Sequence, residues 1–128
     1  ALGVLTGKYS KDKLPSGPRA SIVSKALEDP AYTELLSVMR DVAGKHGPDV
    51  TNSQVAIAWC LAKDTIPIPG VRSVRQAQDN VKAISLGLTP REVEDLDLAA
   101  SKVKPVLSPD TAPFVRESVD TKRKLYEA

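Results

Sequence analysis

The fold is decided by the stretch from Ile66 to Asn80, which reads IPIPGVRSVRQAQDN. It predicts a very short strand, a glycine turn and the start of a helix. Prolines 67 and 69 bar a long hydrogen-bonded strand but permit a short one. Gly70 lets the backbone approach a ligand without hindrance from a Cβ atom. Because Ser73 and Gln76 have the spacing of a capping box, we expect a helix to begin at Ser73.

The start of this helix has the chemistry of an anion site. Its first turn presents free N–H groups and the positive end of the helix dipole, with Arg72 and Arg75 alongside, which favours a phosphate. Gln76, Asp79 and Asn80 are spaced to share one helix face, where they can contact the edge of a polar ring. The stretch therefore predicts a nucleotide-binding corner. The alternative is a well-capped surface helix that follows a buried strand.

Composition restricts the classes of protein that fit. The 128 residues are 41% hydrophobic and carry a net charge of +2, which is typical of a soluble globular protein inside the cell. No apolar run reaches the roughly 18 to 20 residues of a membrane span. A near-neutral charge balance argues against nucleic acid as a main partner. One cysteine and one histidine allow neither an internal disulfide nor a metal site of the usual kind.

Cap and stop signals place four helices. They predict helices from Asp29 to His46, from Thr51 to Ala62, from Ser73 to Gly87 and from Thr89 to Pro105. In the third helix we expect a buried side made of Val74, Ala77, Val81 and Ile84, and in the second we expect Trp59 and Cys60 in the core. Residues 1–8 suit a strand end running into a loop, and residues 10–20 an irregular excursion. Residues 106–128 suit an extended tail with at most a short basic helix near residues 122–125.

These elements contain too few strands to make a sheet. A strand at Ile66–Ile68 needs parallel neighbours to satisfy its backbone, and this chain does not supply them. The chain also opens on Ala1 rather than Met, directly in an apolar run. Either the fold is essentially helical, or the missing strands belong to residues outside this sequence. In the second case we expect the isolated chain to be weakly stable, to aggregate, or to depend on a partner.

Four separate motifs carry a resemblance to a known family. They are ALGVLTGKY at residues 1–9, GPR at 17–19, TNSQVAIAW at 51–59 and PIPGVRS at 67–73 with Gln76 and Asn80. In order and spacing the chain resembles the last third of an aldo-keto reductase. It is most similar to the group with plant, algal and cyanobacterial oxidoreductases and potassium-channel β subunits. The resemblance implies an α/β fold in which residues 1–105 form the C-terminal portion of a (β/α)8 TIM barrel, mostly helical within this chain.

The resemblance also assigns residues to an NADP(H) cofactor. Leu2 and Gly3, with Ala1, fall in the loop over the pyrophosphate, and Lys8 and Arg19 fall at positions that hold or cover the phosphates. Gly70 and Arg72 fall where the adenosine 2′-phosphate is held, although relatives carry a serine at the Arg72 position. Contacts to the adenosine end fall to Gln76, Asp79 and Asn80. The family's catalytic Asp, Tyr, Lys and His lie upstream of this chain, so no catalytic residue is assigned.

The implied function is an NADP(H)-dependent oxidoreductase that reduces aldehyde or ketone groups of a small carbonyl substrate, in the cytoplasm or chloroplast. This chain would be a fragment that carries the cofactor-binding part. The alternative is a non-catalytic NADP(H)-binding regulatory module. A helix-turn-helix DNA-binding protein fits poorly, because nine residues with two prolines, Asp64–Arg72, stand where that motif has a turn of about three or four residues.

Overall fold

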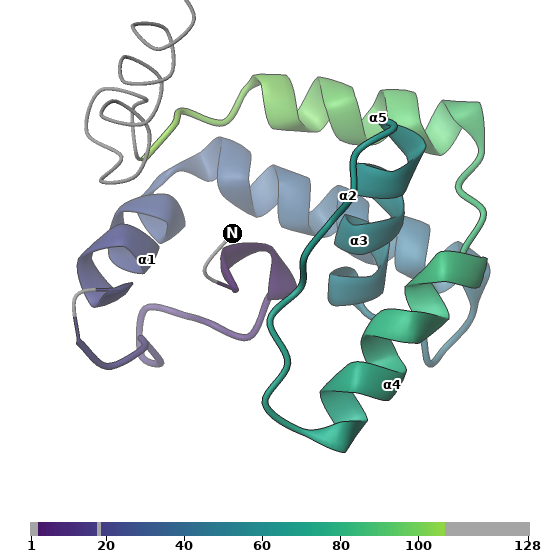
Figure 1. Ribbon diagram of the computed structural model, residues 1–128. Helices are drawn as coiled ribbons and strands as arrows, with labels where there is room; N and C mark the ends of the chain where they lie inside the picture. The colour runs from purple at the N-terminus through teal and green to yellow at the C-terminus, as the bar shows by residue number, and fades with distance from the viewer. Residues whose placement is uncertain (1–2, 18, 107–128) are drawn as a thin grey trace, which may run out of the picture.

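The computed structural model describes residues 3–17 and 19–106, and these fold into an assembly of helices (Figure 1). The elements in chain order are η1 (Val4–Thr6), α1 (Arg19–Glu28), α2 (Pro30–His46), α3 (Asn52–Ala62), α4 (Val74–Lys82), η2 (Ala83–Ser85) and α5 (Pro90–Ser101). Within these described ranges no strand forms, and β pairing is limited to an isolated bridge between Ser10 and Lys13.

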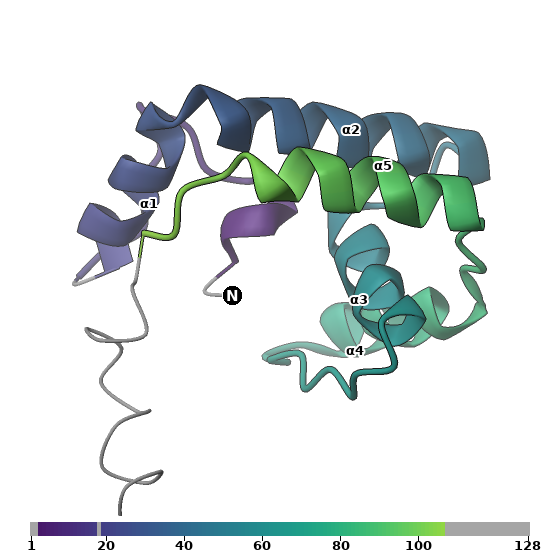
Figure 2. The ribbon, with the colours of Figure 1, turned by 90° about the horizontal axis from the view of Figure 1, so that it is seen from above.

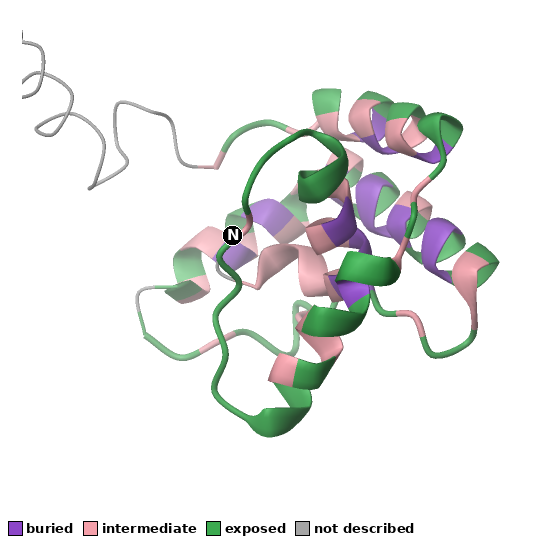
Figure 3. Cartoon of the chain, turned by 45° about the vertical axis from the view of Figure 1, so that its right-hand side comes forward, coloured by how far each residue is buried: buried purple, intermediate pink, exposed green. Residues whose placement is uncertain are grey.

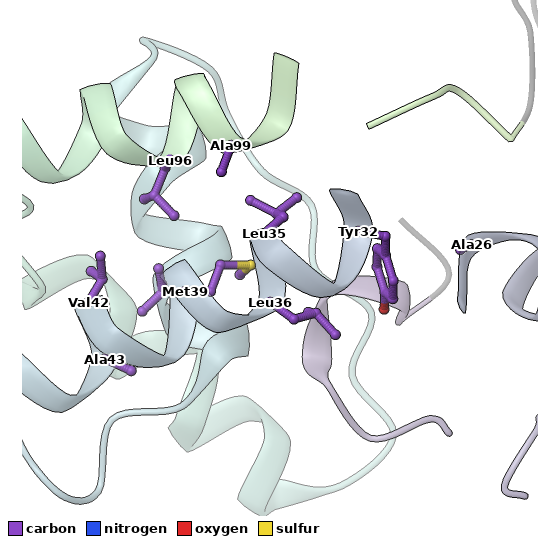
Figure 4. Close-up of a cluster of buried hydrophobic side chains, with 10 residues drawn as sticks. Ala26, Tyr32, Leu35, Leu36, Met39, Val42, Ala43, Leu96 and Ala99 are labelled. Atoms are coloured by element: carbon purple, nitrogen blue, oxygen red, sulfur yellow. The ribbon is translucent and has the colours of Figure 1, made fainter. Parts of the chain in front are cut away.

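The core lies where α2 and α5 run side by side (Figures 1 and 2). Figure 4 shows the side chains of α2 and α5 turned toward one another, and Met39 of α2 and Leu96 of α5 are completely buried. The remaining members of this cluster are Ala26, Tyr32, Leu35, Leu36, Val42, Ala43, Val55 and Ala99. Helix α3 packs beneath α2 and links this core to α4.

The helix starts that the caps predict are confirmed. The Asp29 carboxylate accepts a hydrogen bond from the Ala31 N–H at 2.9 Å, with Pro30 as the first residue of α2. Thr51 with Gln54, and Thr89 with Glu92, form complete capping boxes at the starts of α3 and α5. Local side-chain chemistry therefore fixes where these helices begin. Helix α2 also ends at His46, as its Gly-Pro stop signal predicts.

Helix α1 was not predicted. The expected irregular excursion over residues 10–20 ends in helix at Arg19, and no sequence signal assigned a structure to residues 21–28. This helix has no acidic residue in its first turn, and it buries only Val23 and Ala26, so its apolar pattern is weak. Its packing against α2, rather than its own sequence signals, holds it.

The predicted strand at Ile66–Ile68 is wrong. Residues 66–71 have no regular structure, and Ile66 and Ile68 are 91% and 94% exposed. No strand lies beside them in the described part of the chain, so their backbone groups have no ladder partner there. The strand end expected over residues 1–8 is also wrong from Val4 to Thr6, which form η1. Of the tail predicted for residues 106–128, residues 107–128, with the short basic helix, lie outside the described residues.

The buried side predicted for the helix that begins at Ser73 is wrong as well. Val74 and Val81 of α4 are 75% and 63% exposed, and Ile84 of η2 is 72% exposed. Figure 3 shows α4 as largely exposed. This helix is held to α3 by polar contacts of Asp79 instead. In α3, Trp59 is half-buried and packs against the core cluster, whereas Cys60 is exposed, so the prediction that Cys60 lies in the core is wrong. In the described residues no helix is long and apolar enough to cross a membrane.

Candidate functional site

The candidate site begins with the turn that leads into α4. The Ser73 hydroxyl accepts a hydrogen bond from the Gln76 N–H at 3.2 Å. The Gln76 side-chain oxygen accepts from the Arg72 N–H at 2.7 Å, one residue earlier than a capping box requires. The hydrogen bond from the Gln76 N–H to Ser73 is therefore as predicted, whereas the Gln76 side chain accepts from Arg72 instead of from the Ser73 N–H. The N–H groups of Val74 and Arg75 remain without an intrahelical partner at the helix start.

Two arginine side chains flank this helix start, and neither forms an ion pair with another described residue. Arg72 and Arg75 are both exposed, and the ion pairs between described residues involve neither of them. The same holds for the two other predicted phosphate-binding cations, Lys8 and Arg19. Because no carboxylate of the described residues pairs with them, Arg72 and Arg75 add to the positive end of the α4 dipole, which favours an anion.

Asp79 fastens α4 to the start of α3. Its Oδ1 atom accepts a hydrogen bond from Gln54 Nε2 at 2.6 Å, and its Oδ2 atom accepts from the Thr51 hydroxyl at 3.3 Å. Gln54 Nε2 lies 3.2 Å from the Asp79 backbone carbonyl as well, and Gln54 is only 3% exposed. Asp79 therefore positions the helix that carries the corner.

Asn80, the next residue, has a side-chain amide with unused hydrogen-bonding capacity. Its Nδ2 atom is buried and has no partner among the described residues. An unsatisfied buried donor costs about 1 to 3 kcal/mol of stability, so its presence calls for a structural or functional explanation. A ligand with a hydrogen-bond acceptor at this position would satisfy it.

A second group of predicted residues lies in the N-terminal loop. Gly3 has a φ angle of +74°, and a Cβ atom there would lie 3.3 Å from Lys8 Cε, so the Lys8 side chain folds back over Gly3. Lys8 Nζ also lies 4.9 Å from the centre of the Tyr9 ring. The Tyr32 hydroxyl donates to the Val4 carbonyl and anchors η1 to α2. Leu2, also predicted here, lies outside the described residues.

The N-terminal loop and helix α4 both contact the start of α3. A Cβ atom on Gly7 would lie 3.5 Å from Asn52 Nδ2, and the neighbouring Thr51 contacts Asp79 of α4. The structure does not bring Arg19 to this place, because α1 and α4 lie at opposite sides of the molecule (Figures 1 and 2). The sequence identified Thr51 and Gln54 only as a capping box. Their contacts to α4 span 25 residues or more, and no local pattern predicts them.

A hollow of about 450 Å³ lies elsewhere, between the N-terminal loop, α1 and α2. Thr6, Tyr9, Tyr32, Arg40 and Asn52 are among its lining residues, and none of the predicted cofactor-binding residues is. The hollow therefore does not coincide with the corner at the start of α4. Over the described residues, no cluster of histidine, cysteine and carboxylate side chains is able to hold a metal ion.

Comparison with known proteins identifies the family of this chain. A model of the Aldo/keto reductase family matches residues 1–101. The chain belongs to this family. Aldo/keto reductases have a (β/α)8 barrel fold, of which the described residues of this chain contain helices and no strand.

Curated relatives agree with this membership. A chloroplastic pyridoxal reductase from Arabidopsis thaliana is 46% identical over 101 residues, which cover 79% of this chain and 27% of the relative. A probable voltage-gated potassium channel subunit beta from the same plant is 34% identical over 67% of this chain and 28% of its own length. An aldo-keto reductase from Schizosaccharomyces pombe, named for NADP(+), is 29% identical over 73% of this chain and 28% of its own length. The chain thus spans between a quarter and a third of these curated relatives. No solved structure matches.

Proposed function

We propose that residues 1–105 are the C-terminal, cofactor-binding part of an NADP(H)-dependent aldo-keto reductase. The observation that carries the proposal is the combination at α4 of two cations without acidic partners, Arg72 and Arg75, and one buried amide donor without a partner, Asn80 Nδ2, among the described residues. A phosphate suits the cations, and a ring nitrogen suits the amide. These are the two ends of an adenosine 2′-phosphate.

Different residues of this chain then bind different parts of the cofactor. Arg72 and the free N–H groups at the α4 start hold the 2′-phosphate, and Gly70 keeps the approach to them open. Asn80 donates to the adenine edge, with Gln76 and Asp79 on the same helix face. Leu2, Gly3, Lys8 and Arg19 are assigned to the pyrophosphate through the family resemblance.

NADPH supplies a hydride for the reduction of an aldehyde or ketone, and the substrate is a small carbonyl compound. No residue of this chain is assigned to proton transfer, so the chain alone binds the cofactor and does not reduce a carbonyl. The chloroplastic pyridoxal reductase among the relatives supports a chloroplast location for the oxidoreductase, and the cytoplasm is the alternative.

A non-catalytic NADP(H)-binding module is the second candidate. It is favoured by a specific similarity, since one relative is named as a probable potassium channel subunit beta rather than as a reductase. In such a module the corner binds NADPH with the same residues, and no carbonyl turnover accompanies binding.

Calorimetric titration with NADPH and NADH tests the cofactor assignment. We expect NADPH to bind roughly tenfold more tightly than NADH, because a charge-assisted hydrogen bond contributes about 1.5 to 3 kcal/mol. Arg72→Ala should remove this preference. Arg91→Ala is the matched control, because Arg91 is exposed on α5 and already paired with Glu94 and Asp95. Equal affinities for the two cofactors in the unmodified chain would contradict the proposal.

A further inference from the structure

The hollow between the N-terminal loop, α1 and α2 lies apart from the α4 corner, and its lining has the chemistry of a binding site. Its volume of about 450 Å³ falls in the range of about 300 to 1,000 Å³ that is typical of small-molecule sites. The described residues that line it include two cations, Lys11 and Arg40, and no aspartate or glutamate. The hollow is therefore large enough for a small ligand and positive in charge.

Both cations of the hollow are available to a ligand. Lys11 and Arg40 are exposed, and neither takes part in an ion pair between described residues. Arg40 Nε donates to the Leu36 carbonyl of its own helix at 3.2 Å, which leaves its two terminal amino groups for a ligand. A guanidinium presents its donors in a fork that matches a carboxylate or a phosphate. The hollow therefore favours an anionic oxygen group.

Asn52, the first residue of α3, adds a polar group without a partner. It is only 9% exposed, yet its side-chain amide forms no hydrogen bond with another described residue. Its Nδ2 atom lies beside Gly7, where a Cβ atom would come within 3.5 Å of it. Because the large majority of buried side-chain polar groups have a hydrogen-bond partner, this amide calls for an explanation. A ligand in the hollow would supply the partner.

The remaining wall of the hollow is apolar. Tyr32 and Leu36 of α2 are 2% and 9% exposed, and Figure 4 shows them on successive turns of that helix. With Arg40 they follow at four-residue steps, so the three share one face of α2. Leu27 of α1 and Tyr9 of the loop complete this wall. An apolar wall that ends in a cation suits a ligand with an apolar body and one anionic end.

We propose that this hollow is a second ligand site, which takes a small organic anion with a carboxylate or phosphate group on an apolar body about the size of one ring. Arg40 and Lys11 bind the anionic group, and Asn52 donates a hydrogen bond to the ligand. The apolar body contacts Tyr32 and Leu36. This site is independent of the NADP(H) corner, because none of the residues assigned to the cofactor lines the hollow.

NMR titration of the 128-residue chain with benzoate and with phenyl phosphate tests the proposal. We expect at least one of the two to bind with a dissociation constant of roughly 1 mM or below, and to shift the side-chain amide signals of Asn52. The tighter probe identifies the anionic group. Benzamide has the shape of benzoate without its charge, so it should bind at least about tenfold more weakly. Failure of both anions to bind, or equal binding of benzamide, would overturn the proposal.

Two variants and one control assign the site to its residues. Arg40→Met keeps the length of the side chain without the guanidinium, so it should weaken binding of the tighter probe at least about tenfold. Arg91→Ala on α5 removes an arginine elsewhere and should leave binding unchanged. Equal effects of these two substitutions would contradict the site.

Asn52→Ala separates a ligand contact from a structural role. It should weaken binding about fivefold or more while the thermal midpoint stays nearly unchanged, because the amide forms no hydrogen bond in the protein. A loss of stability without a loss of binding would overturn the assignment of Asn52 to the site.

Competition with NADPH separates the hollow from the cofactor site. Saturating NADPH should leave the affinity for the tighter probe unchanged, and so should Arg72→Ala. Displacement of the probe by NADPH would assign the hollow to the cofactor and overturn the proposal of a second site. A chain that binds the probe but not NADPH would contradict the proposed function and leave the second site standing.

Discussion

Gln54 of α3 donates from Nε2 to Asp79 Oδ1 of α4 at 2.6 Å, while its own Oε1 accepts from the Thr51 N–H at 3.1 Å. One buried side chain thus caps its own helix and holds the helix that carries the candidate cofactor corner. The position of α4 depends on this residue more than on apolar packing, because Val74 and Val81 of α4 are largely exposed.

Replacement of Gln54 by alanine should therefore lower the free energy of unfolding. The change removes a cap and leaves the Asp79 carboxylate without its closest partner, which together cost about 2 to 4 kcal/mol. Urea denaturation followed by circular dichroism measures the loss. Gln78→Ala on the exposed side of α4 is the control, with an expected change of less than about 0.5 kcal/mol. A similar effect of the two substitutions would contradict this role.

Two glycines of the candidate site should respond differently to alanine. Gly3 has a φ angle of +74° and the Lys8 side chain close by, whereas Gly70 has no positive φ and a Cβ atom there would meet nothing within 4 Å. Gly3→Ala should destabilise the chain by about 1 kcal/mol or more. Gly70→Ala should leave the thermal midpoint nearly unchanged and weaken NADPH binding alone. Loss of stability in Gly70→Ala without loss of binding would count against its assignment to the site.

The Glu92 carboxylate should make stability depend on acid pH. Burial raises its pKa, but hydrogen bonds from the Thr89 backbone, His46 and the Thr89 hydroxyl outweigh burial and hold the pKa below its ordinary value of 4.5. A folded-state pKa below the unfolded value means that this stabilisation is complete above the unfolded pKa and is lost as pH falls through the folded one. We therefore expect the free energy of unfolding to fall as pH drops below 4.5.

Urea denaturation between about pH 6 and pH 3 tests this, with Glu92→Gln as the variant. The variant should be less stable at the upper end, and its stability should vary less with pH than that of the unmodified chain. Glu94→Gln is the control, because the Glu94 side chain is 69% exposed and pairs only with Arg91 among the described residues. If both variants show the acid dependence of the unmodified chain, Glu92 does not cause it.

The single tryptophan should report on Asp97. Trp59 Nε1 donates to Asp97 Oδ1 at 2.9 Å, and Lys63 Nζ lies 2.6 Å from Oδ2. The hydrogen bonds from Lys63 and Trp59 hold the pKa of Asp97 below its ordinary value, and the bond from Lys63 has the larger effect. Asp97→Ala should change the Trp59 emission maximum at neutral pH, and the same change should appear in the unmodified chain only when acid protonates Asp97. An emission spectrum unaffected by Asp97→Ala would show that the indole contact is absent in solution.

The sequence predicted the features that local chemistry determines. Thr51, Thr89 and Asp29 begin their helices as expected, because a cap acts within three residues. The strand at Ile66–Ile68 failed, since a strand exists only when a neighbour satisfies its backbone, and none lies in the described residues. The second role of Gln54 was not predictable, because its partner Asp79 is 25 residues away. Arg72 and Asn80 were identified as site residues from spacing and resemblance, and their ligand stays a prediction.

The assignment of the α4 corner to NADP(H) is tested most directly with the adenosine end of the cofactor alone, since that end needs only this corner. Titration calorimetry of the chain with adenosine 2′,5′-bisphosphate and with adenosine 5′-monophosphate measures it. We expect the bisphosphate to bind at least about tenfold more tightly, and Arg72→Ala and Asn80→Ala each to weaken its binding. Equal affinity for the two compounds, or binding that neither substitution changes, would contradict the assignment.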